Sequence, residues 1–254
     1  MGGLLAVLYG GLCYLVFFGV FLYAIGFVGD FLTPTSLDRG TASPAAAAWV
    51  IDIVLLGLFA IQHSGMARRG FKRWLTGWFP KPIERSTYVL LSSLVLALVF
   101  WQWRPLAGTV WNVTTPWAYW LLYAVFAFGW LMVLSSTFLI DHFDLFGLRQ
   151  VWLRMRGREY TPPEFMEHFF YRLIRHPLMV GFIVAFWAIP RMSVGHLLFA
   201  VATTGYILIA IQLEERDLMA AHGDEYRQYR EEVPMLCPWP RPRQRQGGSA
   251  EAAE

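Results

Sequence analysis

Five long apolar stretches limit what this chain can fold into. Residues 1–29, 117–140 and 193–213 contain no Asp, Glu, Lys or Arg, and residues 45–67 and 86–103 are nearly as clear. A helix rises about 1.5 Å per residue, so about 20 residues cross a hydrocarbon core of about 30 Å. We therefore expect an all-α fold, a polytopic transmembrane helical bundle.

A further apolar segment, residues 178–190, leaves the number of spans at five or six. As a helix it is only about 20 Å long, so it forms either a sixth span or a short re-entrant arm. Residues 1–29 lack the basic start and the cleavage site of a signal peptide, and we expect them to remain as the first span. The composition agrees, because only 15% of residues are charged, against about 25% in soluble proteins.

The 21 Lys and Arg residues alternate between rich and poor segments. Residues 68–85, 149–175 and 216–245 hold six each, and Arg39, Arg104 and Arg191 stand alone between them. The positive-inside rule predicts that the rich segments and both termini are cytoplasmic, where membrane lipid headgroups are their partners. The tryptophans of residues 101–120 then lie at the outer interface, a location that excludes nucleic acid as a partner.

The chain is predicted to form one membrane domain over residues 1–237. Residues 68–87 alternate basic and aromatic side chains, a pattern typical of an amphipathic stretch in the membrane interface. From residue 238 to 254, Pro and Arg alternate before a Gly-Gly-Ser run, and this composition predicts a disordered tail.

Two ionisable residues lie within the second apolar stretch. Asp52 and His63 are eleven residues apart and share one helix face, but they are separated by about 16 Å along the axis. They cannot form one site. Ionisable residues inside a span are functional candidates by default, so we take His63 as a candidate substrate contact.

A second cluster follows the fourth apolar stretch. Asp141 and Asp144 flank His142, and Arg149 and Gln150 follow closely as candidate substrate contacts. A histidine oriented by a carboxylate is a common general base, whereas a polar cluster that merely ends a span is the alternative. A metal site is disfavoured because no second histidine stands at ligand spacing, and we assign no metal ligand.

The third cluster is Arg175-His176-Pro177, followed by the apolar hairpin and by Glu214-Glu215. Proline fits the first turn of a helix, which places His176 at the cap. If the hairpin turns at residues 190–193, the glutamates return to the side of the histidine, and such an arrangement suits a zwitterionic cofactor. From helix rise alone we expect His176 and Glu215 to lie at different depths and to clasp the cofactor without meeting.

The region after the last span is predicted to continue as a helix to about residue 221, with Gly223 in its C-cap. A short helix carrying Tyr226 and Tyr229 follows. Because these tyrosines are three residues apart, they share a face. They either cover a cofactor or pack on the neighbouring helices.

Residues 160–235 resemble the C-terminal half of the isoprenylcysteine carboxyl methyltransferase and phospholipid N-methyltransferase group. The resemblance lies in Tyr171, Arg175-His176-Pro177, Gly181, Glu214-Glu215, Gly223, Tyr226 and Tyr229 in this order. It implies an S-adenosyl-L-methionine (SAM) cofactor in a cytoplasmic, helical C-terminal cradle. The cradle residues would be Tyr171, Arg175, His176, Pro177, Leu178, Met179, Gly181, Glu214, Glu215, Tyr226 and Tyr229.

This sequence departs from that group at two places. Leu178-Met179 stand where the group commonly has a small residue and a tyrosine, so a hydroxyl contact to the cofactor is absent. Ala210-Ile211-Gln212 stand where the prenylcysteine enzymes carry an arginine that engages the substrate carboxylate. The second departure argues against a carboxylate acceptor.

Over nearly its full length the chain looks like the bacterial methanethiol S-methyltransferases, which overlap with a group called NnrU-like. The similar runs are Gln62-His63-Ser64, Glu84-Arg85-Ser86-Thr87-Tyr88, Trp101-Gln102-Trp103, residues 141–150 and residues 212–218. The resemblance implies methylation of methanethiol to dimethyl sulfide at a bacterial inner membrane, with hydrogen sulfide as a second candidate thiol. Within this framework we take His142, oriented by Asp141 or Asp144, as the general base.

Three alternatives stay open. The acceptor could be a prenylcysteine or a lipid. The protein could be a non-enzymatic membrane module that binds haem or a metal through His63 and His142. The reaction could also proceed without a dedicated base, because nearby arginines and the cofactor's own charge lower the pKa of the thiol.

Overall fold

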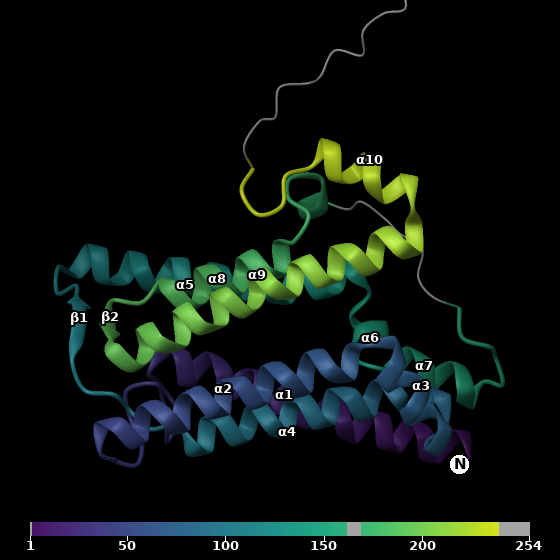
Figure 1. Cartoon of the computed structure of the whole chain (residues 1–254), viewed down its shortest axis with the longest axis horizontal. Helices are drawn as coiled ribbons and strands as arrows, with labels where there is room; N and C mark the ends of the chain where they lie inside the picture. Colours follow the sequence, from purple (N-terminus) through teal and green to yellow (C-terminus); the bar gives the residue numbers. More distant parts are fainter. Residues whose placement is uncertain (1, 162–168, 239–254) are drawn as a thin grey trace, which may run out of the picture.

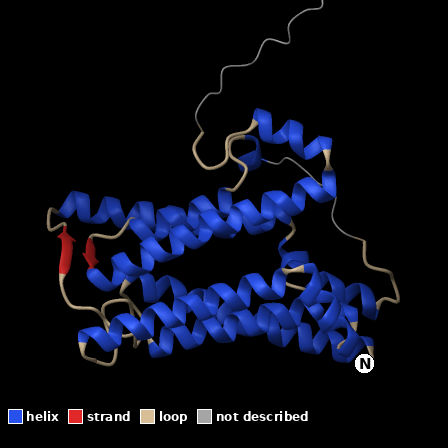
Figure 2. Cartoon of the chain, in the orientation of Figure 1, coloured by secondary structure: helices blue, strands red, loops and turns tan. Residues whose placement is uncertain are grey.

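The computed structural model describes residues 2–161 and 169–238. The predicted tail therefore lies outside the described residues apart from Pro238, and so do residues 162–168 of the predicted cofactor region. Within the described residues the regular secondary structure is helical except for one two-stranded sheet (Figure 2). The predicted all-α class is confirmed.

Five helices are long and apolar enough to cross a membrane. They are α1 (Gly3–Gly29), α2 (Ala45–Ala67), α4 (Glu84–Gln102), α5 (Pro116–Ile140) and α9 (Val194–His222). Helix α8 (Pro177–Trp187) is apolar but has only 11 residues. The sequence left open six spans or five spans with a short arm. The structure has five long apolar helices and one short apolar helix, which matches the second arrangement.

The long helices form two groups that lie side by side (Figure 1). Helix α4 packs on α1 and α2, while α8 packs on α5 and α9, and contacts between α2 and α9 join the groups. At the end of the bundle far from the N-terminus, β1 (Thr109–Asn112) pairs antiparallel with β2 (Arg191–Ser193). The turn predicted at residues 190–193 is therefore present, and the short sheet that holds it was not predicted.

The short helices lie toward the end of the bundle where the chain begins (Figure 1). They are α3 (Arg69–Trp78), η1 (Lys81–Ile83), α6 (His142–Leu145), α7 (Leu148–Met155), η2 (Phe169–Arg172) and α10 (Asp224–Glu232). The described parts of the three basic segments belong to this end. Helix α3 is amphipathic as predicted, because Leu75 is buried and Trp78 is 77% exposed beside basic side chains.

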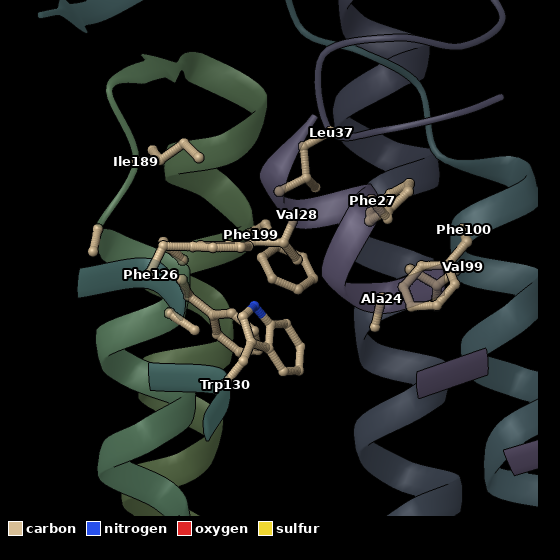
Figure 3. Packing of buried hydrophobic residues seen from close by; sticks show 14 of the residues in the cluster. Ala24, Phe27, Val28, Leu37, Val99, Phe100, Phe126, Trp130, Ile189 and Phe199 are labelled. Atoms are coloured by element: carbon tan, nitrogen blue, oxygen red, sulfur yellow. The ribbon is translucent and has the colours of Figure 1, made fainter. Parts of the chain in front are cut away.

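The buried core is strongly aromatic and connects the two groups of helices (Figure 3). On one side Trp130 packs edge-on against Phe126 and Phe186; on the other, Phe27 lies 4.6 Å from Phe100, centroid to centroid. Phe199 of α9 contacts Trp103 across the boundary at 6.0 Å. Aromatic pairs in these geometries add about 0.5–1.5 kcal/mol each beyond the area they bury.

Helices α5 and α8 cross in close contact at two glycines. A Cβ atom added at Gly181 would lie 2.8 Å from the Gly129 carbonyl oxygen and 2.9 Å from the Val133 nitrogen. A Cβ atom at Gly129 would lie 2.7 Å from the Ala185 nitrogen. Small residues permit such close approach of two apolar helices. These contacts show that α5 and α8 run antiparallel. One turn beyond the contact of Val133 with Gly181, Thr137 of α5 therefore lies at the same height along the helices as His176, at the start of α8.

Candidate active site

The cap of α8 and the glutamates of α9 lie on the same side of the bundle, as predicted, and they are in direct contact. Pro177 is the first residue of α8 and His176 is its N-cap. Arg175 Nη2 lies 2.7 Å from Glu215 Oε1, and His176 Nε2 lies 3.1 Å from the same oxygen. The prediction that His176 and Glu215 lie at different depths is wrong. Residues 188–190 are not helical, and a non-helical residue spans a greater length than the 1.5 Å rise of a helical one. The segment from α8 to the turn is therefore longer than a helix of the same number of residues.

Arg175 and Glu215 form a buried pair that is fully engaged within the protein. Each side chain is 4% exposed. Arg175 Nη1 also donates to the carbonyl oxygens of Arg230 and Val233, and Arg230 Nε lies 3.4 Å from Glu215 Oε2. Both residues were predicted to contact the cofactor. In the structure each of them is held by the other.

Glu214 is the carboxylate that stays accessible. Its side chain is 49% exposed, and its Oε2 lies 3.6 Å from His176 Nδ1. Burial, and then the negative charge of Glu214, raise the pKa of the Tyr171 hydroxyl. His176 and Glu214 therefore face each other at the start of α8, and Tyr171 lies within electrostatic range of Glu214. Leu178 and Met179 are half-buried in the first turn.

Tyr226 and Tyr229 adopt the packing alternative. They are 1% and 4% exposed and form a small cluster with Val233. The Tyr229 hydroxyl donates to the Tyr171 carbonyl oxygen at 2.6 Å. Burial raises the pKa of Tyr226 to about 12, with a further contribution from Glu215. Gly223 caps α9 with a positive φ of 58°, as predicted.

The segment after α10 also contacts the start of α8, and no feature of the sequence indicated this contact. The backbone N–H of Arg175 donates to the Pro234 carbonyl oxygen at 2.9 Å, and that of His176 donates to the Met235 carbonyl oxygen at 3.3 Å. The segment thus fixes the backbone just before α8. Gly181, by contrast, packs against α5, and this contact explains the glycine without any cofactor.

His142 does not have the partners predicted for it. Its Nδ1 lies 2.8 Å from Thr137 Oγ1 and its Nε2 lies 2.8 Å from the Tyr14 hydroxyl. Neither Asp141 nor Asp144 forms one of these hydrogen bonds, so the predicted orientation by a carboxylate is wrong. The reason is the backbone of Asp141, whose φ of 124° folds α6 back against the end of α5. Such strain in a residue other than glycine often marks a functional site.

The two aspartates belong to a separate polar network. Arg149 Nη1 lies 3.5 Å from Asp141 Oδ2 and 3.4 Å from Asp144 Oδ1. Gln150 donates to the Asp144 carbonyl oxygen, and the Tyr160 hydroxyl donates to Asp144 Oδ2. These contacts join α6 to α7 and account for Arg149 and Gln150 without a substrate.

His63 lies between α2 and α4. The Tyr88 hydroxyl is 3.0 Å from its Nε2, and Ser92 Oγ is 3.3 Å from its Nδ1. Asp52 is fully buried at the other end of α2, where its Oδ1 accepts from the Arg104 N–H at 2.9 Å. The two residues therefore belong to different environments, as expected. Asp52 fixes the end of α4.

The described residues contain no group of three or more His, Cys, Asp or Glu side chains that could hold a metal ion. Two cavities of about 420 and 500 Å³ lie along α1 near Tyr23. Their lining contains none of the predicted site residues. The polar groups around His176 and His142 are therefore the better candidates for chemistry.

Comparison with known proteins identifies the family. The model of the family described as "NnrU protein" matches residues 53–215. The methanethiol S-methyltransferase of Mycobacterium tuberculosis is 57% identical, over 93% of this chain and 97% of its own length. That of Crocosphaera subtropica is 54% identical, over 92% and 91%.

Similarity extends beyond bacteria. Mouse nurim is 32% identical, over 68% of each chain. No solved structure matches the chain significantly. The resemblance expected from the sequence is confirmed by the bacterial relatives, which cover almost the whole chain. The chain belongs to the NnrU family, together with the bacterial methanethiol S-methyltransferases.

Proposed function

We propose that this chain methylates methanethiol to dimethyl sulfide, with SAM as the methyl donor. The observation that carries the proposal is the similarity to relatives named methanethiol S-methyltransferase along nearly their full length. The run Ala210-Ile211-Gln212 supports a small acceptor without a carboxylate, because it stands where the prenylcysteine enzymes carry an arginine that pairs with that group.

The residues at the start of α8 fit this cofactor. SAM supplies a methyl group bound to a positively charged sulfur. Glu214 offers an accessible carboxylate for a cationic group, and the first backbone N–H groups of α8, which have no acceptor within the helix, suit an anionic one. The buried ion pair of Arg175 and Glu215 supports the start of α8, because Glu215 also contacts His176. Leu178 and Met179 add apolar surface in the first turn.

His142 is the proposed general base. Burial lowers the pKa of its imidazole, an effect that the charge of Asp141 partly opposes. A lowered pKa keeps the imidazole neutral and able to accept a proton near neutral pH. Its partner Thr137 is level with His176 in the α5–α8 register, so the base and the cofactor cradle lie at similar depth.

We assign this end of the bundle to the cytoplasm of a bacterium and the long helices to its inner membrane. The described parts of the three Lys- and Arg-rich segments lie toward the end where the chain begins, and SAM is made in the cytoplasm (Figure 1). Membrane lipid would surround the apolar helices. A small thiol such as methanethiol, or hydrogen sulfide, can reach the site through the bilayer.

An acceptor panel with the purified protein in detergent tests the proposal. SAM is mixed in turn with methanethiol, hydrogen sulfide, a prenylated cysteine and a phospholipid, and S-adenosylhomocysteine is measured. The proposal predicts turnover with methanethiol. Turnover with only the prenylcysteine or the lipid would contradict the assignment of the acceptor. Failure to bind SAM in calorimetry would contradict the methyltransferase assignment itself.

A further inference from the structure

The hydrogen bonds of His142 determine where its proton lies. The Thr137 hydroxyl donates its single proton to the Leu134 carbonyl oxygen at 2.7 Å, because a carbonyl can only accept. The His142 Nδ1 atom, 2.8 Å from the same hydroxyl oxygen, must therefore be the donor in that contact. In a neutral imidazole the other nitrogen then accepts. His142 Nε2 thus accepts from the Tyr14 hydroxyl at 2.8 Å.

The basic nitrogen of His142 is consequently turned toward α1 and covered by Tyr14. His142 is 5% exposed, whereas Tyr14 is half-buried. A substrate thiol cannot reach Nε2 directly while Tyr14 holds it. Tyr14 is the more exposed residue of the pair, and its hydroxyl oxygen has a second lone pair that can accept a hydrogen bond.

The surroundings of Tyr14 and His142 suit a small apolar thiol. Phe138 stacks on the imidazole at 4.2 Å between centroids, and Phe146 lies edge-on at 4.9 Å. On α1, Phe18 lies 6.3 Å from the Tyr14 ring. Sulfur atoms make favourable contacts with aromatic rings, of about 0.3–1.5 kcal/mol each.

We propose that Tyr14 relays the proton of the acceptor thiol to His142, an inference that rests on the proposed function. The S–H bond breaks and its proton moves to the Tyr14 oxygen, while the Tyr14 proton moves to His142 Nε2. The electron pair of the S–H bond stays on sulfur, which becomes the nucleophilic thiolate. Tyr14 ends as it began, and His142 becomes an imidazolium.

The charged groups around His142 fit this step. On its own helix, Asp141 favours the positive imidazolium, and Asp144 carries a second carboxylate. Arg149 of α7 partly neutralises both carboxylates. On the α4 side, Arg85 donates to the Leu145 carbonyl oxygen. The relay therefore ends on a nitrogen where a new positive charge has a nearby counter-charge.

Replacement of Tyr14 by phenylalanine tests the relay, because it removes the hydroxyl and keeps the ring. We expect Tyr14→Phe to lower kcat with methanethiol at pH 7 by about 100-fold or more, the usual contribution of a general base. The defect should shrink as the pH rises, since the thiol then ionises unaided. Tyr14→Phe combined with His142→Gln should be no slower than the slower single variant.

Tyr23→Phe is the matched control, because Tyr23 lies on the same helix and its hydroxyl pairs with Thr35 Oγ1 at 2.7 Å. It should leave kcat within a few fold of the wild type. If Tyr14→Phe behaves like this control at every pH, or if the double variant multiplies the two defects, the relay is rejected. If the wild-type protein forms no dimethyl sulfide, the proposed function itself is rejected.

Nitrogen-15 NMR of histidine-labelled protein gives a readout without turnover. The wild type should show the His142 signals of a neutral imidazole protonated at Nδ1, assigned by their loss in His142→Gln. The Nε2 signal should shift in Tyr14→Phe and stay unchanged in Tyr23→Phe. An imidazole protonated at Nε2 in the wild type would overturn the proposal.

Discussion

Glu214 and Glu215 allow one chemical change to be tested in two environments. Glu215 Oε1 accepts from both Arg175 and His176 in a pair that is 4% exposed. Removal of one partner of a buried ion pair costs about 3–5 kcal/mol. Glutamine keeps one acceptor oxygen, so we expect Glu215→Gln to cost about 3 kcal/mol, at the low end of that range. For a chain of this size, that corresponds to a fall in Tm of about 6–12 °C.

Glu214→Gln should have the opposite profile. The Glu214 side chain is 49% exposed, and such ion pairs contribute at most about 1 kcal/mol to stability. Its Tm should stay within about 4 °C of the wild type. If Glu214 holds a cationic group of SAM, loss of the charged hydrogen bond should weaken binding at least about tenfold.

Thermal unfolding in detergent and calorimetric titration with SAM measure both quantities on the same samples. We expect Glu215→Gln to lose mainly thermal stability and Glu214→Gln to lose mainly affinity for SAM. Equal loss of stability in the two variants would refute the assignment of Glu215 as the buried support. Unchanged SAM affinity in Glu214→Gln would refute the assignment of Glu214 as the cofactor contact.

Three further predictions follow from the packing and the buried histidine. Gly181→Ala should lower the Tm, because overpacking against the backbone of α5 costs about 1–3 kcal/mol, whereas Gly205→Ala, with nothing within 4 Å, should not. Burial lowers the pKa of His142 below 6.5, so the neutral imidazole contributes to stability above about pH 6.5, and this contribution is lost as the pH falls below that value. Below pH 6.5, the Tm of His142→Gln should therefore depend less on pH than the Tm of the wild type. Asp144→Asn should destabilise the α6–α7 network with SAM affinity unchanged, as melting and calorimetry can show.

Local signals in the sequence predicted much of the fold. Long uncharged stretches fix the spans, Pro177 fixes the start of α8, and Gly223 fixes the end of α9, because each acts through the backbone of its own segment. The sheet between β1 and β2 was not predictable, since its strands are four and three residues long and distant in the chain.

The environment of His142 shows where local reasoning fails. The neighbouring Asp141 and Asp144 suggested a carboxylate partner, but the backbone turn at Asp141 directs the imidazole toward Tyr14. Tyr14 lies 128 residues away, on a helix whose sequence carries no other polar anchor for the site. A contact of that kind depends on how helices pack, and no spacing rule reveals it. The direct contact of His176 with Glu215 likewise required the actual path of residues 188–190.

This chain is proposed to move a methyl group from SAM to methanethiol. The most direct measurement uses purified wild-type protein, SAM with a deuterated methyl group, and methanethiol, followed by mass spectrometry of the headspace. We expect dimethyl sulfide with one deuterated methyl group per molecule and an equal amount of S-adenosylhomocysteine. Absence of dimethyl sulfide, or dimethyl sulfide without the label, would contradict it.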